Sequence, residues 1–371
     1  MTASKTPGPL AGTRVVEFGN LIAAPFCAML LADLGADVVK VEPPSGDLGR
    51  GFGPYINGES VFFLSANRGK RSIVVDFGTE EGRRKAFELA ASADVVVNNL
   101  RHGAMERLGL DEETVRSANP AVIYAVVSAF GADGPYAKRT GIDVIFQAES
   151  GMMSLTGDPG SPPGKTATTI GDYVAATNTA FAICAGLVGR EKSGAGSRVD
   201  VSLRDSLIAV QAGWNAIGFA LDDQPERTGT ASPFLAPNRM FETADGHFVI
   251  AIVSDRHYRT MCEALDRLDL IEPFLGNDAR LAERGRLEEI LTPIFAAEET
   301  AHWLELFSRA GLPCGRVLTL PEVWNDPQVR HNEMVHEYDH PVAGRVRGLG
   351  SPIRIDGRQA RSDLPPPPLE H

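Results

Sequence analysis

The chain is organised around one stretch, residues 171–190, which read GDYVAATNTAFAICAGLVGR. Its content of Ala, Leu and Ile predicts a helix from Tyr173 to about Arg190. Ahead of it, residues 156–164 are rich in glycine and proline, which prevent a helix or a central strand from continuing. Asp172 therefore lies where a loop meets a helix, a place that exposes a carboxylate and still holds it. Taken alone, the position also fits an ordinary N-cap, whose carboxylate accepts backbone N–H bonds.

On the N-terminal side of this stretch, short apolar segments alternate with helical patterns. The pattern predicts strands at 14–18, 37–42, 72–77, 94–99 and 122–128, and helices at 22–34, 79–91 and 111–118. Strands that alternate with helices indicate a parallel sheet covered on both faces, because parallel neighbours need a crossover. We therefore expect an α/β fold with a Rossmann-like parallel sheet, which binds ligands at the carboxyl ends of its strands.

On the C-terminal side, the pattern predicts a second, smaller α/β region. A strand at 199–203 and a helix at 205–219 still belong to the large domain, and the smaller region has a strand at 247–253 and helices near 258–265, 282–295 and 300–309. Residues between the two regions are rich in Asp, Gly, Ser, Thr and Pro, which marks a linker or mobile loop. We expect a large domain at 1–221, a linker at 222–239, a small domain at 240–325 and a C-terminal segment at 326–371.

Composition excludes several classes of protein. With 43% hydrophobic and 23% charged residues, the chain of 371 residues has the make-up of an ordinary globular protein. Its net charge of −12 argues against a nucleic-acid binder, which needs basic clusters to meet phosphates. No apolar run approaches the roughly 20 residues of a membrane span. We expect no nucleic-acid partner and no membrane partner.

The termini and the cysteines indicate a cytoplasmic chain. Residues 1–7 lack the apolar stretch of a secretory signal. The four cysteines are far apart and lie in apolar surroundings, so they suggest core positions in a reducing compartment. Residues 369–371, which follow four prolines, look like a remnant of cloning and are left out of the fold prediction.

Common cofactor and nucleophile motifs are missing or incomplete. Gly160 to Thr166 looks like a phosphate loop, but it is one residue too short between its glycines and contains two prolines without N–H groups. The sequence has no GxGxxG, GxSxG or HExxH pattern, so it predicts no nicotinamide, no flavin and no hydrolase elbow. His331, His336 and His340 have polar neighbours and read as loop residues, and we expect no metal site.

Basic residues gather near the ends of the predicted strands. They are Arg68, Lys70 and Arg71, then Arg101 and Arg107, and then Lys138 and Arg139. Each group alone is explained as a solvated face. Together, at one edge of a sheet, they form the local positive surface that an anionic ligand needs in an acidic protein.

Several segments, in the same order and over nearly the whole chain, resemble the class III CoA-transferases, the family of carnitine, formyl-CoA and bile-acid CoA-transferases. These segments are GADVVKVE at 35–42, NRGKRS at 67–72, DVVVNNL at 94–100, QAESG at 147–151 with TG at 156–157, VDVSL at 199–203, GLPCG at 311–315 and NDPQV at 325–329.

The resemblance implies an enzyme that moves coenzyme A from an acyl-CoA thioester to a free carboxylic acid. Its nucleophile is an aspartate that forms a covalent intermediate, and the matching residue is Asp172. Coenzyme A is a substrate here, and no tightly bound cofactor is implied. The family also forms an interlocked homodimer. The family residues that hold coenzyme A match Leu21, Ala23, Lys70, Asn99, Leu100, Arg101, Arg107 and Arg139.

Two departures from the family narrow the function. Related racemases of acyl-CoA need an acid and a base on opposite faces of a carbon, and carry a His where this chain has Ile142. The matching small-domain stretch, residues 251–254, has no carboxylate. The chain also lacks the glycine-rich lid of formyl-CoA transferase, with residues 229–234 in its place, and has Ile22 where that enzyme has Gln, which puts oxalate as acceptor in doubt. The alternatives are an acyl-CoA racemase or epimerase, disfavoured by Ile142, and a non-catalytic protein that binds coenzyme A.

Overall fold

The computed structural model describes residues 8–369 of the chain. Two segments named in the sequence analysis lie outside the described residues. They are residues 1–7, which lack a signal sequence, and residues 370–371 of the expected cloning remnant. The chain divides into two compact units. The large unit holds the residues up to 152, residues 165–222 and the residues from 327 onward, and the small unit holds residues 153–164 and 223–326. The domain bounds expected from the sequence stay a prediction.

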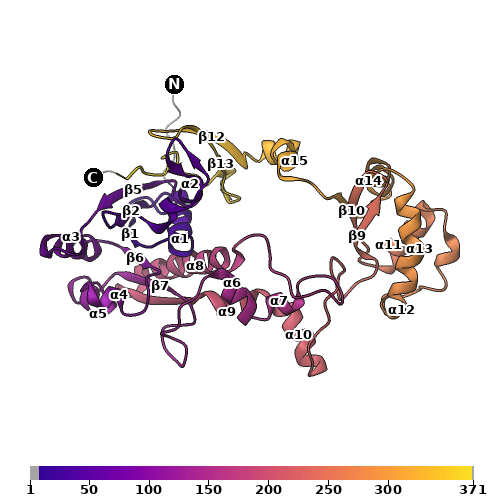
Figure 1. Cartoon of the computed structure of the whole chain (residues 1–371), viewed down its shortest axis with the longest axis horizontal. Coiled ribbons are helices and arrows are strands. Elements are labelled where there is room, and N and C mark those ends of the chain that lie inside the picture. Colours follow the sequence, from indigo (N-terminus) through magenta and orange to yellow (C-terminus); the bar gives the residue numbers. More distant parts are fainter. Residues whose placement is uncertain (1–7, 370–371) are drawn as a thin grey trace. The chain divides into compact units, whose positions relative to one another are not determined.

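The centre of the large unit is a sheet of six parallel strands in the order β5-β2-β1-β6-β7-β8 (Figure 1). The order runs outward from β1 in both directions, so the sheet is doubly wound and has its switch point between β1 and β6. This confirms the predicted α/β fold with a parallel sheet. The strands are β1 Arg14–Phe18, β2 Asp37–Glu42, β5 Lys70–Val74, β6 Val95–Asn98, β7 Ile123–Ser128 and β8 Ser197–Ser202.

Helices cover both faces of this sheet because side chains alternate along each strand. Val15 belongs to the apolar cluster formed with α1 (Ala23–Asp33) and α8 (Ile170–Ser193). The next residue, Val16, belongs to the cluster on the other face, formed with α3 (Glu80–Ala91) and α5 (Glu112–Ala118). Figure 1 shows the strands between these two pairs of helices. The inner strands β1, β2, β6 and β7 are thus buried on both sides, as their continuous apolar runs predict, whereas the edge strands β5 and β8 are partly exposed.

Shorter elements of the large unit complete the edges of the sheet. They are η1 Leu48–Gly51, β3 Tyr55–Ile56, β4 Glu59–Ser60, α2 Val61–Ala66, α4 Ala104–Arg107, α6 Asp143–Glu149, α9 Leu203–Val210 and α10 Ala212–Leu221. Near the boundary with the small unit lies α7, Met152–Leu155.

The C-terminal segment packs on the large unit. It contains α16 Pro327–His331, the hairpin of β12 Val335–His340 and β13 Gly344–Leu349, and the short pair β14 Arg354–Ile355 and β15 Arg358–Gln359. Ala343 and Val346 of the hairpin form an apolar cluster with Leu64. Further along, the Gly69 N–H donates a backbone hydrogen bond to the Leu364 carbonyl (2.9 Å). The C-terminal segment near Leu364 therefore lies against the start of β5.

The small unit has a core of its own around a three-stranded antiparallel sheet in the order β11-β10-β9. The strands are β9 Asn238–Thr243, β10 Gly246–Ala251 and β11 Cys314–Arg316. The helices are α11 Asp255–Ala264, η2 Leu268–Leu270, α12 Asn277–Ala282, α13 Arg284–Ala296, α14 Thr300–Arg309 and α15 Leu320–Asn325. Phe295 packs edge-on against Phe248 and Trp303 at centroid distances of 5.0 and 5.2 Å.

Three predicted elements differ from the structure. The strand predicted at 72–77 is β5, which starts two residues earlier, because Lys70 already pairs with Val38 of β2. The helix predicted at 205–219 is broken at Gln211, whose side chain donates to the carbonyls of Leu207 (2.7 Å) and Ser150 (3.2 Å). The helix predicted at 282–295 is α13, which starts two residues later, and the separate short helix α12, which ends at Ala282, was not predicted.

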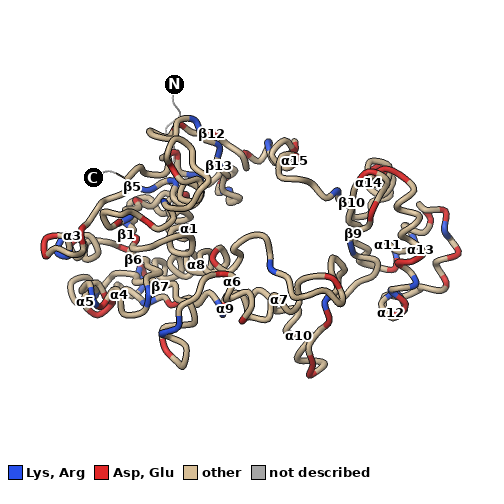
Figure 2. Tube along the Cα trace, in the orientation of Figure 1, with Lys and Arg blue, Asp and Glu red and all other residues tan. Residues whose placement is uncertain are grey.

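Charged residues of both signs are mixed along the described chain. Figure 2 shows acidic and basic positions interspersed over the elements of both units. In the part of the chain that the structure describes, no helix is long and apolar enough to cross a membrane. Within residues 8–369, no three His, Cys, Asp or Glu side chains gather as a metal cluster, and the four cysteines are free thiols.

Candidate functional site

Asp172 is the third residue of α8, in the first turn of the helix rather than at its cap. The N-cap position belongs to Thr169, and that cap has no side-chain hydrogen bond. Asp172 itself is half-buried, and its carboxylate has no hydrogen bond or ion pair with any residue from 8 to 369. The alternative of an ordinary N-cap is therefore wrong, because a capping carboxylate accepts backbone N–H groups.

The start of α8 is fixed by two buried polar side chains of α6. Asp143 accepts a hydrogen bond from the Gly171 N–H (2.7 Å) and another from the Gln147 side-chain amide (2.5 Å). The amide oxygen of Gln147 accepts the backbone N–H of Thr166 (2.9 Å). A Cβ at position 171 would lie 2.8 Å from the Asp143 carboxylate, so only glycine fits there. The backbone next to Asp172 is thus held in one place.

Burial and the charge of Asp143 raise the pKa of Asp172 to about 7. Burial does so because it disfavours the charged form, and Asp143 does so because two negative charges repel. The neighbouring Tyr173 packs edge-on against Phe26 of α1, with ring centroids 4.8 Å apart. The result is a carboxylate of unusual basicity at a rigid helix start, and such shifts are common at functional sites.

The first turn after β1 and the turn after β6 meet at the switch point of the sheet. Asn20 and Asn99 exchange two hydrogen bonds of 2.9 Å each, one from the Asn20 N–H and one to the Asn20 carbonyl. Leu21 follows with a φ of 65°, a left-handed conformation that costs a residue with a Cβ about 1 kcal/mol or more. Its N–H donates to Asp47 (3.0 Å). The strained turn is therefore held by contacts from two loops.

Four of the predicted coenzyme A residues lie around this switch point. Leu21 and Asn99 are part of the joined turns, Leu100 follows Asn99 and is half-buried, and Ala23 is the buried first residue of α1. The structure thus brings together the residues that the sequence placed at two separate strand ends. Their contact with coenzyme A stays a prediction.

Lys70 lies inside the protein beneath this turn. Its ammonium donates to Glu17 (2.7 Å), to the Pro25 carbonyl (2.8 Å) and to Asn67 (2.7 Å), so its three hydrogens are used. Burial lowers the pKa of Lys70 to about 8, although Glu17 raises it. The side chain of Lys70 therefore supports the switch point from inside the protein, and its predicted contact with coenzyme A stays a prediction.

A second buried ammonium, that of Lys40, shares the same counter-ion. It lies 2.6 Å from the other oxygen of Glu17 and 2.7 Å from Asp47, and donates to the Gly19 carbonyl (2.9 Å). Glu17, Lys40 and Lys70 are all nearly free of solvent exposure. Since these residues sit on β1, β2 and β5, one ionic network ties three strand ends to the turn at 19–21.

The three predicted arginines are all exposed, but they differ in their partners. Arg101 and Arg107 have no ion pair or side-chain hydrogen bond with residues 8–369. Arg139 donates twice to Glu149 (2.6 and 3.1 Å), and this pairing raises the pKa of Arg139 further. Arg101 and Arg107 are therefore the cations left available for an anionic ligand.

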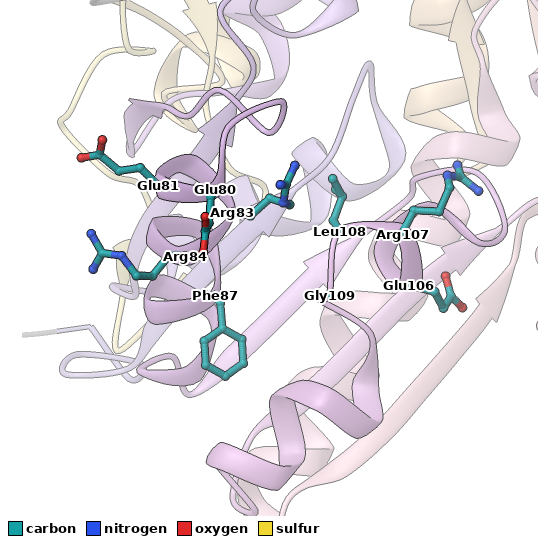
Figure 3. A pocket seen from close by; sticks show the side chains of 9 residues that line it. All are labelled: Glu80, Glu81, Arg83, Arg84, Phe87, Glu106, Arg107, Leu108 and Gly109. Atoms are coloured by element: carbon teal, nitrogen blue, oxygen red, sulfur yellow. The ribbon is translucent and has the colours of Figure 1, made fainter.

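A surface pocket of about 900 Å³ lies between α3 and the turn after α4. In Figure 3, Arg83 reaches from α3 towards Leu108, whereas Arg107 points away from α3. Asp172 does not line this pocket. Its volume alone therefore does not make it the site of the nucleophile, and the polar turns at the switch point are better placed by the topology of the sheet.

Sequence reasoning missed Asp143, Gln147, Glu17 and Lys40. A signal for the first two was present, since residues 143 and 147 are four apart on one helical segment and so share a face. For Glu17 and Lys40 the signal was a charge inside each of two apolar strands that are buried on both sides. At the position of the racemase His, Ile142 is 63% exposed and can move no proton.

Comparison with known proteins shows which family this chain belongs to. A profile of CoA-transferase family III matches residues 10–371. Succinyl-CoA:glutarate CoA-transferase of Mus musculus is 36% identical over 365 residues, 97% of this chain and 84% of that one. Acetyl-CoA:oxalate CoA-transferase of Acetobacter aceti is 34% identical over 375 residues, 99% of this chain and 94% of that one. A crystal structure of a CAIB/BAIF family protein from Brucella suis matches with a TM-score of 0.88 and 35% identity, covering 98% of this chain and 97% of that one.

The ionic network predicts a large loss of stability for Glu17→Gln. The amide leaves two buried ammoniums without their shared charge, so the free energy of unfolding should fall by about 3 to 5 kcal/mol. Urea unfolding would measure it. Arg71→Met is the control, because it breaks an exposed pair with Asp37 (2.7 Å) and should cost less than about 1 kcal/mol. Equal losses in the two variants would contradict the role given to Glu17.

The raised pKa of Asp172 predicts that Asp172→Asn is more stable than the parent above pH 7. In the unfolded chain this carboxyl ionises near pH 4, but in the folded chain only near pH 7, so the parent loses stability as the pH rises between them. One pKa unit corresponds to about 1.4 kcal/mol, so the variant should gain stability of that order or more by pH 8. Urea unfolding at pH 5 and pH 8 tests this, with Asp133→Asn on an exposed loop as control. A difference between variant and parent that does not grow with pH would overturn it.

Proposed function

We propose that this chain, which belongs to CoA-transferase family III, transfers coenzyme A through a covalent bond to Asp172. That it is a CoA-transferase follows from its family. The route through Asp172, the residues that hold coenzyme A, the acceptor acid and the dimer are our proposals. One observation supports the route through Asp172. Its carboxylate is half-buried and unpaired within residues 8–369, and its pKa is raised to about 7.

The reaction starts when ionised Asp172 attacks the carbonyl carbon of the acyl-CoA thioester. The C–S bond breaks, the thiolate of coenzyme A leaves, and the acyl group and Asp172 form a mixed anhydride. The thiolate then attacks the Asp172 carbonyl carbon and releases the donor acid as its carboxylate. What remains is a thioester between Asp172 and coenzyme A.

The acceptor acid completes the transfer by the same two steps in reverse order. Its carboxylate attacks the Asp172 carbonyl carbon, so that coenzyme A leaves as thiolate and a second anhydride forms. The thiolate attacks the acceptor carbonyl of this anhydride, which gives the new acyl-CoA and frees the Asp172 carboxylate. Atoms and charges balance over the four steps, with no water and no redox partner consumed.

The environment of Asp172 suits each of these steps. Because no donor within residues 8–369 engages its oxygens, their electron pairs remain free for attack. A raised pKa makes the carboxylate a stronger base and a stronger nucleophile once ionised. Partial burial limits the access of water, which would hydrolyse an anhydride. The hydrogen bond from Gly171 to Asp143 keeps the backbone next to the nucleophile in place.

For coenzyme A we propose the switch point of the sheet. Leu21, Ala23, Asn99 and Leu100 lie around it, and Arg101 and Arg107 follow on the same edge. An exposed guanidinium with no partner in the described chain can donate two parallel hydrogen bonds to a phosphate. The acidic chain would thus meet an anionic ligand through local charges rather than through its net charge.

For the acceptor we propose a small dicarboxylic acid, with succinyl-CoA as donor. Similar proteins are named succinyl-CoA:glutarate, succinyl-CoA:mesaconate and acetyl-CoA:oxalate CoA-transferase, and each of these acceptor acids has two carboxyl groups. A panel of glutarate, mesaconate, oxalate and a monocarboxylic acid, each offered succinyl-CoA, would identify the acceptor. Transfer to the monocarboxylic acid alone would contradict the proposal.

We also propose a cytoplasmic homodimer, interlocked as in the family. The support is a set of large apolar side chains left exposed on consecutive helices of the large unit, which a second copy would cover. The four free thiols fit a reducing compartment. The exposed side chains include Phe181 (76%) and Val188 (59%) on α8, Val210 (53%) on α9, and Phe219 (83%) and Leu221 (64%) on α10.

Covalent catalysis predicts that hydroxylamine inactivates the enzyme only while acyl-CoA is present. An anhydride or thioester of Asp172 reacts with this amine, whereas a resting carboxylate does not. Peptide mapping by mass spectrometry over many turnovers should find the hydroxamate on Asp172. Asp172→Asn should lose transfer by several orders of magnitude and take no label, and Asp200→Asn, exposed on β8, should be labelled like the parent. Protection by acyl-CoA, or a label elsewhere, would sink the assignment.

The proposed coenzyme A site predicts that Arg107→Ala raises KM for every CoA thioester by a similar factor. The contact would be with the nucleotide that all donors share, so KM for the acceptor acid should change little. Removal of one charge-assisted contact of about 1.5 to 3 kcal/mol corresponds to roughly ten- to a hundredfold. Arg84→Ala is the control, since Arg84 lines the same pocket but pairs with Glu88 at 2.6 Å. An effect confined to one acyl group would refute the contact.

A further inference from the structure

Two arginines and two aromatic rings gather where β7 and β8 end. We call them the ring cluster: Phe130, Tyr136, Arg139 and Arg204. The guanidinium carbon of Arg139 lies 4.6 Å from the centre of the Phe130 ring and 4.7 Å from that of Tyr136. That of Arg204 lies 5.2 and 5.6 Å from the same two centres. The rings themselves meet edge to face at 5.8 Å. Two cations are thus brought to one pair of rings.

The backbone fixes where Arg204 stands. Ser128 of β7 and Ser202 of β8 are paired at the carboxyl ends of their strands. Arg204, the second residue of α9, donates its backbone N–H to the Ala129 carbonyl (3.3 Å), and Ser202 caps the same helix. Arg204 therefore lies at the edge of the parallel sheet where ligands bind.

Arg204 and Arg139 differ in what their guanidinium groups do. The guanidinium of Arg139 donates two hydrogen bonds to the carboxylate of Glu149. Arg204 makes no hydrogen bond of this kind: its Nε is buried without a hydrogen-bond partner, and its ion pair with Asp205 is longer, at 3.7 Å, to a side chain that is 61% exposed. A buried donor without an acceptor is rare and calls for an explanation. A ligand that supplies oxygen atoms would explain it.

We propose that Arg204 binds a phosphate group of the acyl-CoA substrate, a role that rests on the coenzyme A site proposed above. The Arg204 guanidinium lies over both rings, which favour a cation there, and its Nε still lacks an acceptor. A planar fork of N–H donors matches two oxygens of a phosphate. Arg139 of the same cluster is among the coenzyme A residues predicted from the sequence, and Arg204 adds a second cation beside it, whose Nε has no hydrogen-bond partner.

The competing explanation is purely structural. In it, Arg204 stacks on Phe130 and Tyr136 only to hold the loop between β7 and α6, and no ligand touches it. The two explanations differ in what they require. A phosphate contact needs the charge of residue 204 and a ligand that carries phosphate, whereas stacking affects all ligands alike.

The experiment measures binding and transfer in the full chain with Arg204→Met and Arg204→Lys. Calorimetry gives Kd for free coenzyme A and for pantetheine, which has the thiol arm but no phosphate. Steady-state kinetics gives KM for succinyl-CoA and for the acceptor acid. Arg198→Met is the matched control, because Arg198 lies at the amino end of β8, the strand that leads into α9, and pairs with Asp200 and Glu112. Thermal unfolding shows whether each variant is folded.

We expect Arg204→Met to weaken coenzyme A binding and raise KM for succinyl-CoA by roughly ten- to a hundredfold, with KM for the acceptor within about twofold of the parent. Pantetheine should bind the parent and the variant equally. Arg204→Lys keeps the charge but not the fork, so its loss should be smaller. Arg198→Met should match the parent.

Three results would overturn the proposal. They are an unchanged Kd for coenzyme A, an equal loss for pantetheine and coenzyme A, and a change confined to KM for the acceptor acid. If Arg204→Met does not fold, Arg204→Lys decides by the same ratio of coenzyme A to pantetheine binding. Calorimetry does not depend on turnover, so it still decides the role of Arg204 if the route through Asp172 fails its own test.

Discussion

The two oxygens of Glu17, each given to a different buried ammonium, are the constraint on which the proposed coenzyme A site depends. Lys40 and Lys70 reach Glu17 from neighbouring strands, and each also donates to a backbone carbonyl in or beside the first turn after β1. A buried charge without its partner is costly, so the three residues must be kept together. Their burial costs free energy, but it fixes the turn that carries Leu21, which stays in a left-handed conformation at the switch point.

A second, smaller arrangement of the same kind holds the nucleophile. Asp143 and Gln147 are buried and satisfied by hydrogen bonds, and through them α6 fixes the loop that leads to Asp172. The contrast between two carboxylates 29 positions apart is instructive. Asp143 accepts hydrogen bonds and positions the backbone, whereas Asp172 has none from residues 8–369 and takes its raised pKa from burial and from Asp143. Neighbouring acids thus acquire different roles from their surroundings.

The cations near the edge of the sheet are of two kinds, buried ones that pair with acids and others that have no close acid partner or only a distant one. Lys40 and Lys70 are neutralised inside the protein and support the backbone. Arg101 and Arg107 have no ion pair in the described chain, and Arg204 has only the exposed Asp205 at 3.7 Å. This division explains how a chain of net charge −12 can meet an anionic substrate. Paired charges stabilise the fold, and the unpaired ones remain for recognition. Arg139 stands between the two groups, since it is exposed but bound to Glu149.

The sequence by itself determined the parallel α/β sheet and where most of its strands run, because apolar runs and crossover helices are local patterns. It also singled out Asp172, through a loop, a helix and a family resemblance. Only the tertiary structure decided that Asp172 is no cap, that the side chain of Lys70 is used up inside the protein, and that Asn20 joins Asn99 across the switch point. Those facts depend on which side chains from distant strands meet, and a hydrogen bond between residues 79 positions apart leaves no periodic trace in a sequence. The break at Gln211 has the same origin, since its side chain bonds to a carbonyl 61 positions away.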